Sequence, residues 1–190
     1  MPDEPALDAC VVLVEPQDPV NIAATVRAMK NMGIHALRLV RPAPYEPSRI
    51  EGVAHDTADL VAGIRHFDSL DDAIADCVRV AGFTARRRAA KRAAATPRDA
   101  ALDLIAHAPA GTVALLFGRE DHGLPNAALD RAHLVVTIPT TGHASLNLAQ
   151  AVLIALYELH LAAPSLSRTL APPRKDAPPA PAVQFERLFA

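Results

Sequence analysis

Three clusters of glycine and polar residues stand directly after short apolar runs, and they are the candidates for chemistry in this chain. The first contains Asn21 and Arg27, the second lies between Gly118 and Gly123, and the third opens at Ser145. Polar side chains and free N–H groups at the carboxyl ends of parallel strands are the groups with which α/β proteins bind ligands. The strands and helices around these clusters must therefore bring them together if they form one site.

The third cluster follows an apolar run at 134–138, which Pro139 ends because proline cannot continue a strand ladder. Ser145 to Asn147 then opens an apolar helix that is predicted to reach residue 163. Serine or asparagine at a helix start satisfies free backbone N–H groups. An ordinary capped strand-to-helix junction explains this stretch as well as a ligand site does.

The second cluster places charged residues between two glycines at the end of a strand. Gly118 permits a close backbone approach, and Gly123 permits a positive φ before the next helix. This pattern favours a ligand loop over a plain turn. It is neither a phosphate-binding Walker loop nor a Rossmann fingerprint, because the Gly-Lys-Ser/Thr and triple-glycine patterns are missing.

The first cluster lies at the start of a predicted helix. Arg27 follows Asn21 by six residues, nearly two turns, so both side chains can share one side of that helix. A helix-capping asparagine and a surface arginine explain the pair equally well.

A basic run follows the third predicted strand and contains no acidic residue. A solvated charged face is the usual meaning of such a run. A patch that contacts phosphates is the alternative, and it gains weight because the run lies at the carboxyl end of a strand; both interpretations stay open. The cations that would form this nucleic-acid-binding patch are Arg86, Arg87, Arg88, Lys91 and Arg92.

Several classes of function are disfavoured. Asp121, His122 and Ser145 could be imagined as a hydrolase triad, but no Gly-x-Ser-x-Gly elbow accompanies them. The eight histidines show no metal-ligand spacing, so no metal is expected. Cys10 and Cys77 are expected to be buried free thiols.

The net charge of −2 restricts any nucleic-acid site to a local patch. No secretory signal and no membrane-spanning run is visible, and we expect a cytoplasmic protein.

The alternation of apolar runs and amphipathic segments predicts an α/β fold, a mostly parallel sheet with helices on both faces. Strands are predicted at 10–15, 36–40, 78–83, 112–117 and 134–138. Helices are predicted at 20–33, near 49–65, at 69–75, 97–107, 124–132 and 147–163. Residues 1–163 form the domain, and 164–190 read as a Pro/Ala-rich linker and the start of a helical extension that is cut short.

Taken in order, the three clusters resemble one family. Asn21…Arg27, then Phe117-Gly118-Arg119-Glu120-x-x-Gly123-Leu124, then Ile138-Pro139…Ser145-Leu146-Asn147 are similar to the SpoU (TrmH) class of SPOUT RNA 2′-O-methyltransferases. Thr84-Ala85-Arg86 and the sequence 146–151 point further to the TrmJ-like branch, which methylates tRNA. The resemblance covers residues 10–163.

This resemblance implies a fold, a cofactor and an assembly. The carboxyl-terminal part of the sheet would thread a deep trefoil knot, a rare exception to the usual chain connections. The cofactor would be S-adenosylmethionine, and the active unit a homodimer with its sites near the subunit interface. The partner would be RNA, with tRNA ahead of rRNA, while an RNA-binding protein of the same fold without catalysis is a further alternative.

The resemblance also implies roles for residues. Those matching the family's functional side chains are Asn21, Arg27, Glu120, Ser145 and Asn147. Those matching its cofactor loops are Thr84, Ala85, Arg86, Phe117, Gly118, Ile138, Ala144, Ser145 and Leu146. Arg27 is expected to contact a substrate phosphate, and Glu120 is expected to hold Asn21 by hydrogen bonding.

Three features depart from the family pattern. The loop between Pro139 and Ser145 is one residue shorter than the family's, with Gly142 and His143 in place of its usual residues. Ala23 stands where the family often has glycine, and the long carboxyl-terminal helical extension of the TrmJ-like branch is missing or short.

Overall fold

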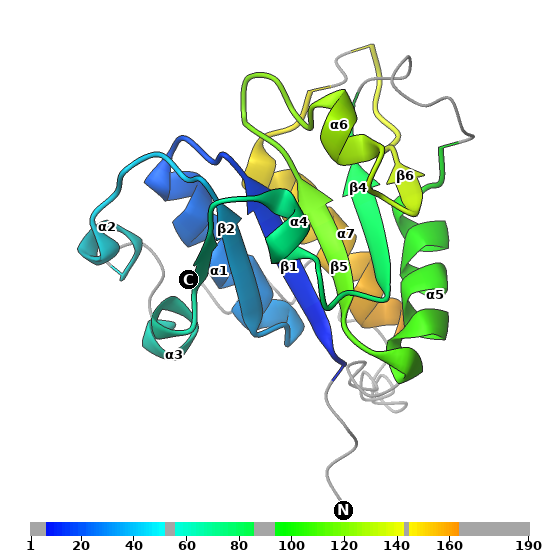
Figure 1. Cartoon of the computed structure of the whole chain (residues 1–190), viewed down its shortest axis with the longest axis horizontal. Coiled ribbons are helices and arrows are strands. Elements are labelled where there is room, and N and C mark those ends of the chain that lie inside the picture. Colours follow the sequence, from blue (N-terminus) through cyan, green and yellow to red (C-terminus); the bar gives the residue numbers. More distant parts are fainter. Residues whose placement is uncertain (1–6, 52–55, 86–93, 143–144, 164–190) are drawn as a thin grey trace, which may run out of the picture.

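A parallel sheet of six strands forms the centre of the part described by this computed structural model, residues 7–51, 56–85, 94–142 and 145–163 (Figure 1). The strand order is β3-β2-β1-β5-β4-β6, and every pairing is parallel. The strands are β1 (Ala9–Val14), β2 (Ala36–Val40), β3 (Arg65–Phe67), β4 (Arg79–Phe83), β5 (Val113–Phe117) and β6 (Leu134–Val136).

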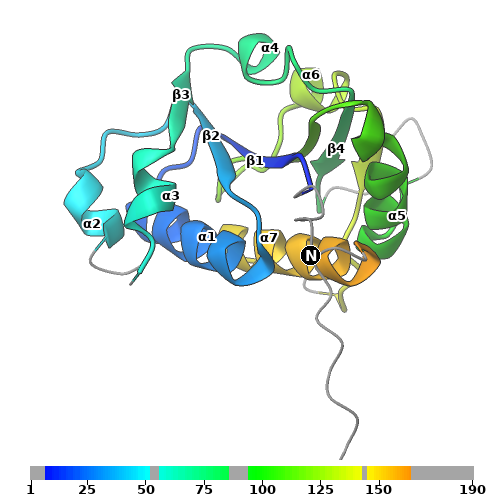
Figure 2. The same ribbon diagram turned by 90° about the horizontal axis from the view of Figure 1, so that it is seen from below.

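Helices cover both faces of the sheet, as the sequence predicts (Figure 2). One face carries α1 and α5, with α7 packed between them, and the other carries α4 and α6. The helices are α1 (Pro19–Met32), α2 (Pro47–Glu51), α3 (Ala58–Ala62), α4 (Leu70–Ala73), α5 (Pro97–His107), α6 (Asn126–Leu129) and α7 (Leu148–Ala162), with a 3₁₀ turn at Ala108–Ala110.

The central strands are apolar on both sides because both sides are covered. In β1, Val11 and Leu13 belong to the core under α1 and α7, while Cys10, Val12 and Val14 belong to the core on the opposite face. This alternation follows from the two-residue period of a strand.

The predicted elements match the observed ones with four exceptions. The helical segments predicted near 49–65 are wrong in their extent: the structure describes α2 at Pro47–Glu51 and α3 at Ala58–Ala62, and Arg65–Phe67 is a strand. The strand β3 escaped prediction because it is a three-residue edge strand whose first two residues are exposed, so it has no apolar run. The strand β6 ends at Val136, and α6 has one turn where 124–132 was predicted.

Capping residues fix the helices that flank the functional site. Asp18 caps α1 by accepting a hydrogen bond from the Val20 N–H, and Gly33 ends α1 with φ 73°. The alternative that Asn21 is the helix cap is therefore wrong. The side chain of Asn21 is available for other hydrogen bonds. Asn147 caps α7, as predicted.

The trefoil knot depends on the segments that join β4 to α5 and β6 to α7. Both segments include residues outside the described ranges, 86–93 and 143–144, and the knot stays a prediction. The predicted linker and the extension at 164–190 also lie outside the described residues. Within the described residues, no helix has the length and apolar character that crossing a membrane requires.

Candidate active site

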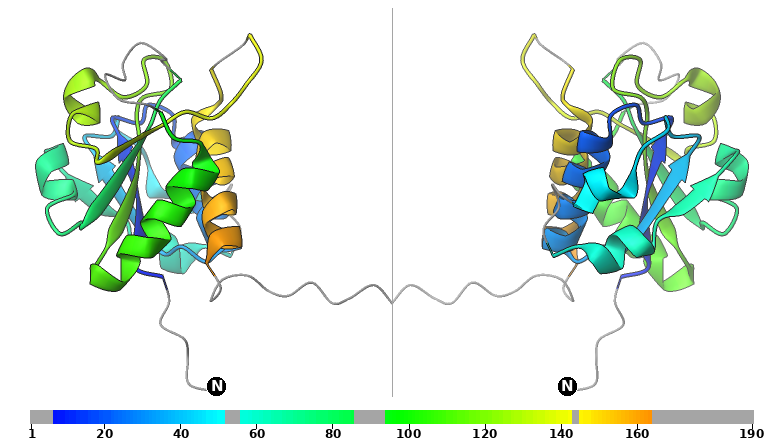
Figure 3. Two further views of the ribbon diagram at one scale, coloured as in Figure 1. Left: turned by 90° about the vertical axis from the view of Figure 1, so that its right-hand side faces the viewer. Right: turned by 90° about the vertical axis from the view of Figure 1, so that its left-hand side faces the viewer.

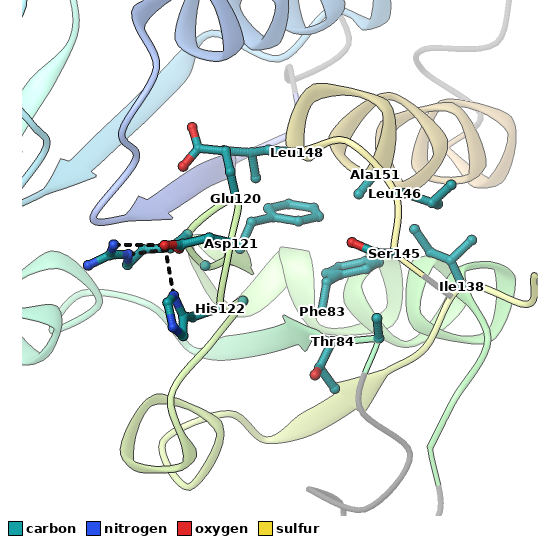
Figure 4. A pocket seen from close by; sticks show the side chains of 15 residues that line it. Phe83, Thr84, Glu120, Asp121, His122, Ile138, Ser145, Leu146, Leu148 and Ala151 are labelled. Atoms are coloured by element: carbon teal, nitrogen blue, oxygen red, sulfur yellow. Dashed lines mark hydrogen bonds and ion pairs between the residues drawn. The ribbon is translucent and has the colours of Figure 1, made fainter. Parts of the chain in front are cut away.

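A pocket of about 310 Å³ opens at the carboxyl ends of β4 and β5 (Figure 4). The loops after these strands form one side, and the segment that leads into α7 forms the other. This volume lies at the lower end of the range for small-molecule sites. Figure 3 shows that α7 begins at this same edge of the sheet.

Most of the residues predicted for cofactor binding line this one pocket. They are Thr84, Ala85, Phe117, Gly118, Ile138, Ser145 and Leu146. The two remaining predictions, Arg86 and Ala144, lie outside the described residues. Segments separated by more than 50 residues in the sequence thus meet at a single cavity.

Aromatic and aliphatic side chains form the apolar wall of the pocket. The rings of Phe83 and Phe117 stack with their centroids 4.6 Å apart, and Ile138 and Leu146 also line the cavity. Leu148 and Ala151 of α7, like Phe83, line the pocket without having been predicted for it. Phe83 could have been found as the last residue of its strand, next to Thr84.

The loop from Gly118 to Gly123 folds tightly back on itself. A Cβ atom on Gly118 would lie 2.1 Å from the carbonyl carbon of Gly123, so no other residue fits. Gly123 has φ 65°, and its N–H donates to the Arg119 carbonyl at 2.8 Å. Both glycine predictions are confirmed.

Glu120 is the centre of a hydrogen-bond network that joins this loop to the start of α1. Its carboxylate accepts from the backbone N–H groups of Gln17 (3.0 Å) and Asp18 (3.1 Å) and from the Asn21 amide nitrogen (3.1 Å). Burial alone would raise the pKa of Glu120, but these hydrogen bonds outweigh burial and hold that pKa below its usual value. The expected hydrogen bond between Glu120 and Asn21 is present.

Asn147 extends the network to α7. Its Nδ2 donates to the Oδ1 atom of Asn21 at 2.8 Å, and its own Oδ1 accepts from the N–H of Ala149 at 2.9 Å. The chain Glu120–Asn21–Asn147 therefore ties together the loop after β5, the start of α1 and the start of α7. Three residues that the resemblance assigned to function are in direct contact.

Charged side chains form the rim of the pocket beside Glu120. Arg119 makes two hydrogen bonds of 3.0 Å to Asp121, and His122 Nδ1 lies 2.8 Å from the same carboxylate. Arg119 and then His122 hold the pKa of Asp121 far below its usual range. Ser145 lies across the pocket from His122 in Figure 4, so a hydrolase triad is not assembled.

Arg27 stands apart from this pocket. It is exposed on α1, and it is not among the described residues that line the cavity. The five cations at 86–92 that were assigned to RNA binding lie outside the described residues. Among the described residues, no group of three or more potential metal ligands is found.

The sequence and the fold are those of a known class of methylases. Residues 8–157 match the family model described as the SpoU rRNA Methylase family. The chain belongs to this family, and the resemblance drawn from its motifs is confirmed.

Individual relatives place the chain near the TrmJ proteins. It is 39% identical over 153 residues to the tRNA (cytidine/uridine-2′-O-)-methyltransferase TrmJ of Sodalis glossinidius, covering 80% of this chain and 60% of the relative. The structure is similar to that of TrmJ from Z. mobilis ZM4, with a TM-score of 0.75, 32% identity and coverage of 95% and 76%.

A further similar structure contains bound cofactor. An AdoMet-bound rRNA methyltransferase from Sinorhizobium meliloti has a TM-score of 0.62 at 25% identity and covers 81% of this chain and 56% of its own. The match to the TrmJ of Sodalis glossinidius covers only part of that protein: the present chain spans about 60% of its length.

Proposed function

We propose that this chain is the methyltransferase domain of an enzyme that transfers a methyl group from S-adenosylmethionine to a ribose 2′-OH of cytidine or uridine in tRNA. The observation that carries the proposal is the meeting of the predicted cofactor residues in one pocket beside the Glu120–Asn21–Asn147 chain. The activity for which the TrmJ relative is named, tRNA (cytidine/uridine-2′-O-)-methylation, supports the substrate class.

The residues of the pocket fit S-adenosylmethionine. The stacked rings of Phe83 and Phe117 and the aliphatic side chain of Ile138 suit a flat, apolar adenine. The charged rim and Ser145 suit the polar parts of the cofactor. When bound, S-adenosylmethionine supplies a methyl group on a positively charged sulfur, so no metal is required.

The side chains around the pocket would align and stabilise the reacting groups. A ribose hydroxyl is a weak nucleophile that loses its proton as it attacks, so its oxygen gains negative charge. Ser145 and Asn147 would orient the ribose and the loop, while Glu120 holds Asn21 in place.

Arg27 is assigned to charge stabilisation and not to proton removal. A guanidinium does not lose its proton in proteins, so it cannot act as the base. Arg27 would bind the phosphate next to the target ribose and stabilise the developing alkoxide. A phosphate oxygen or water would accept the proton.

A homodimer would complete the site. Leu153, Tyr157 and Leu161 follow one another every four residues on α7 and are 40–50% exposed, so they form an apolar stripe on one side of that helix. A second copy of the chain would cover the stripe.

Because α1 packs beside α7, dimerisation would also place Arg27 near the interface. We propose that each Arg27 serves the pocket of the other protomer.

Two measurements separate this proposal from its alternatives. Calorimetric titration with S-adenosylmethionine should give saturable heat, whereas an RNA-binding protein without catalysis should give none. Transfer of labelled methyl groups should then be compared on purified tRNA and on purified rRNA. Label in tRNA supports the proposal, and label only in rRNA makes the chain an rRNA enzyme. No label in either RNA contradicts both assignments.

We place the reaction in the cytoplasm, where tRNA is available.

A further inference from the structure

The only two cysteines of the chain are in contact although they are 67 residues apart in the sequence. Cys10 lies in β1, and Cys77 lies in the segment between α4 and β4. Their Sγ atoms are 3.9 Å apart, and both thiols are free. The pair lies on the face of the sheet covered by α4 and α6, near the amino ends of β1 and β4 and away from the pocket.

A buried arginine stands beside the pair. Arg38 is 5% exposed, its Nη1 atom lies 3.6 Å from the Cys77 sulfur, and the same atom donates to the Ala73 carbonyl at 2.7 Å. Its Nη2 atom donates to the Asp76 carboxylate at 2.9 Å. The guanidinium is therefore fixed in place, and a fixed positive charge stabilises a thiolate.

The two thiols differ in exposure and in acidity. Cys10 is fully buried, whereas Cys77 is half-buried. The hydrogen bond between the two thiols and the positive charge of Arg38 lower the pKa of Cys77, whereas burial and Asp76 raise it. That hydrogen bond and burial raise the pKa of Cys10. Cys77 thus has the properties of an attacking sulfur and Cys10 those of a resolving sulfur.

We propose that Cys77 and Cys10 form a thiol–disulfide exchange site, which reacts with a small-molecule disulfide of the glutathione type and closes to an internal Cys10–Cys77 disulfide. The proposal rests on the contact of the two sulfurs and on the buried guanidinium beside one of them. It does not depend on the methyltransferase function.

The reaction proceeds in two balanced exchanges. The Cys77 thiolate attacks one sulfur of glutathione disulfide, which forms a mixed disulfide on Cys77 and releases one glutathione thiolate. This step removes the negative charge from Cys77. The hydrogen bond to Cys77, which is the largest cause of the raised pKa of Cys10, is therefore lost. The Cys10 proton then passes to the released thiolate, and the Cys10 sulfur attacks Cys77 and expels the second glutathione. The protein loses two electrons, and glutathione disulfide gains them.

The test is to incubate the purified protein with glutathione disulfide and to measure its intact mass and free thiols over time. Wild type should lose both thiols and retain no glutathione. Cys10→Ala should stop at a stable adduct with one glutathione, because the resolving sulfur is absent. Cys77→Ala should stay unmodified, because its remaining thiol is buried and protonated.

Peptide mapping of the oxidised wild-type protein gives a readout that needs no variant to fold. It should show the Cys10 and Cys77 peptides joined to each other and released by a reductant. Two unchanged thiols, a wild-type protein that keeps glutathione, or a disulfide between two copies on a non-reducing gel would each overturn the proposal.

Discussion

At the residue scale, Glu120 shows how a single carboxylate can hold a site together. It lies in the loop after β5, yet its partners Gln17, Asp18 and Asn21 belong to the end of β1 and the start of α1. A carboxylate that accepts several N–H groups is stabilised in its charged form. Glu120 therefore acts as an anchor for the polar chain that continues to Asn147.

Replacing Glu120 by glutamine should destabilise the protein and reduce methyl transfer. The charge is lost, and the new NH₂ group faces N–H donors, so we expect a loss of about 2 kcal/mol in the free energy of unfolding. Denaturant unfolding of both proteins measures this difference. An equally stable Glu120→Gln protein with normal activity would contradict the anchoring role.

The same carboxylate should give the wild-type protein a pH-dependent stability. Its pKa in the folded protein lies below the value near 4.5 of an unperturbed glutamate. The stabilisation is therefore fully present above about pH 5 and is lost as the pH falls through the folded pKa. Glu120→Gln should flatten this part of the stability profile, which urea unfolding at a series of pH values can follow. Parallel profiles for the two proteins would show that Glu120 does not contribute.

Gly118 provides a test of the loop geometry. A methyl group there would lie within 2.4 Å of three backbone atoms of Gly123 and Leu124, so Gly118→Ala should displace the loop and abolish cofactor binding. We expect the free energy of unfolding to fall by about 2 kcal/mol. Gly142→Ala is the matched control, because nothing lies within 4 Å of its Cβ position. Calorimetric titration with S-adenosylmethionine compares the two, and normal binding by Gly118→Ala would refute the assignment.

The sequence allowed most of this residue-scale account to be predicted, but not all of it. Charged residues between two glycines identified the loop, since their chemistry is local. The capping role that remained open for Asn21 was wrong, because Asp18 and Pro19 already start the helix three residues earlier. The link between Asn147 and Asn21 joins residues 126 positions apart, and no local pattern reveals such a contact.

At the element scale, the start of α7 combines a structural task with a proposed functional one. Asn147 caps the helix through its Oδ1 atom and reaches Asn21 through its Nδ2 atom. The long apolar pattern of α7 and the buried strands β1 and β5 were predicted from periodicity. The short strand β3 was missed because neighbouring β2, and not its own sequence, dictates it.

Two substitutions of Asn147 can separate its tasks. Asn147→Ala removes the cap and should lower the free energy of unfolding by about 1 kcal/mol. Asn147→Asp keeps an oxygen for the cap but cannot donate to Asn21, so it should be the more stable of the two and still lose activity. Thermal unfolding and methyl transfer together check this pattern. Full activity of Asn147→Asp would mean that the contact with Asn21 is dispensable.

At the scale of the whole molecule, the account requires two copies of the chain. The apolar stripe of α7 is exposed in the single chain, while Arg27 lies outside that chain's own pocket. The proposed dimer would account for both features at once. Neither the dimer nor the knot follows from composition or periodicity, because a dimer depends on how two chains meet and a knot on how distant parts of one chain meet.

We expect Tyr157→Glu to keep the chain monomeric and to abolish methyl transfer, because it places a charge in the apolar stripe that the proposed dimer would bury. Leu102→Glu is the matched control: Leu102 is also exposed, at 58%, but it lies on α5. Light scattering coupled to size-exclusion chromatography measures the mass of each variant. A Tyr157→Glu protein that remains an active dimer would show that this stripe is not the interface.

The central claim is that the chain methylates the ribose 2′-OH of RNA with Arg27 as an essential group. The most direct measurement is nucleoside mass spectrometry of tRNA after incubation with S-adenosylmethionine and either wild-type protein or Arg27→Ala. We predict 2′-O-methylated cytidine or uridine with the wild-type protein and none with Arg27→Ala, although the variant still binds the cofactor. Methyl groups on a base, or equal ribose methylation by both proteins, would contradict the account.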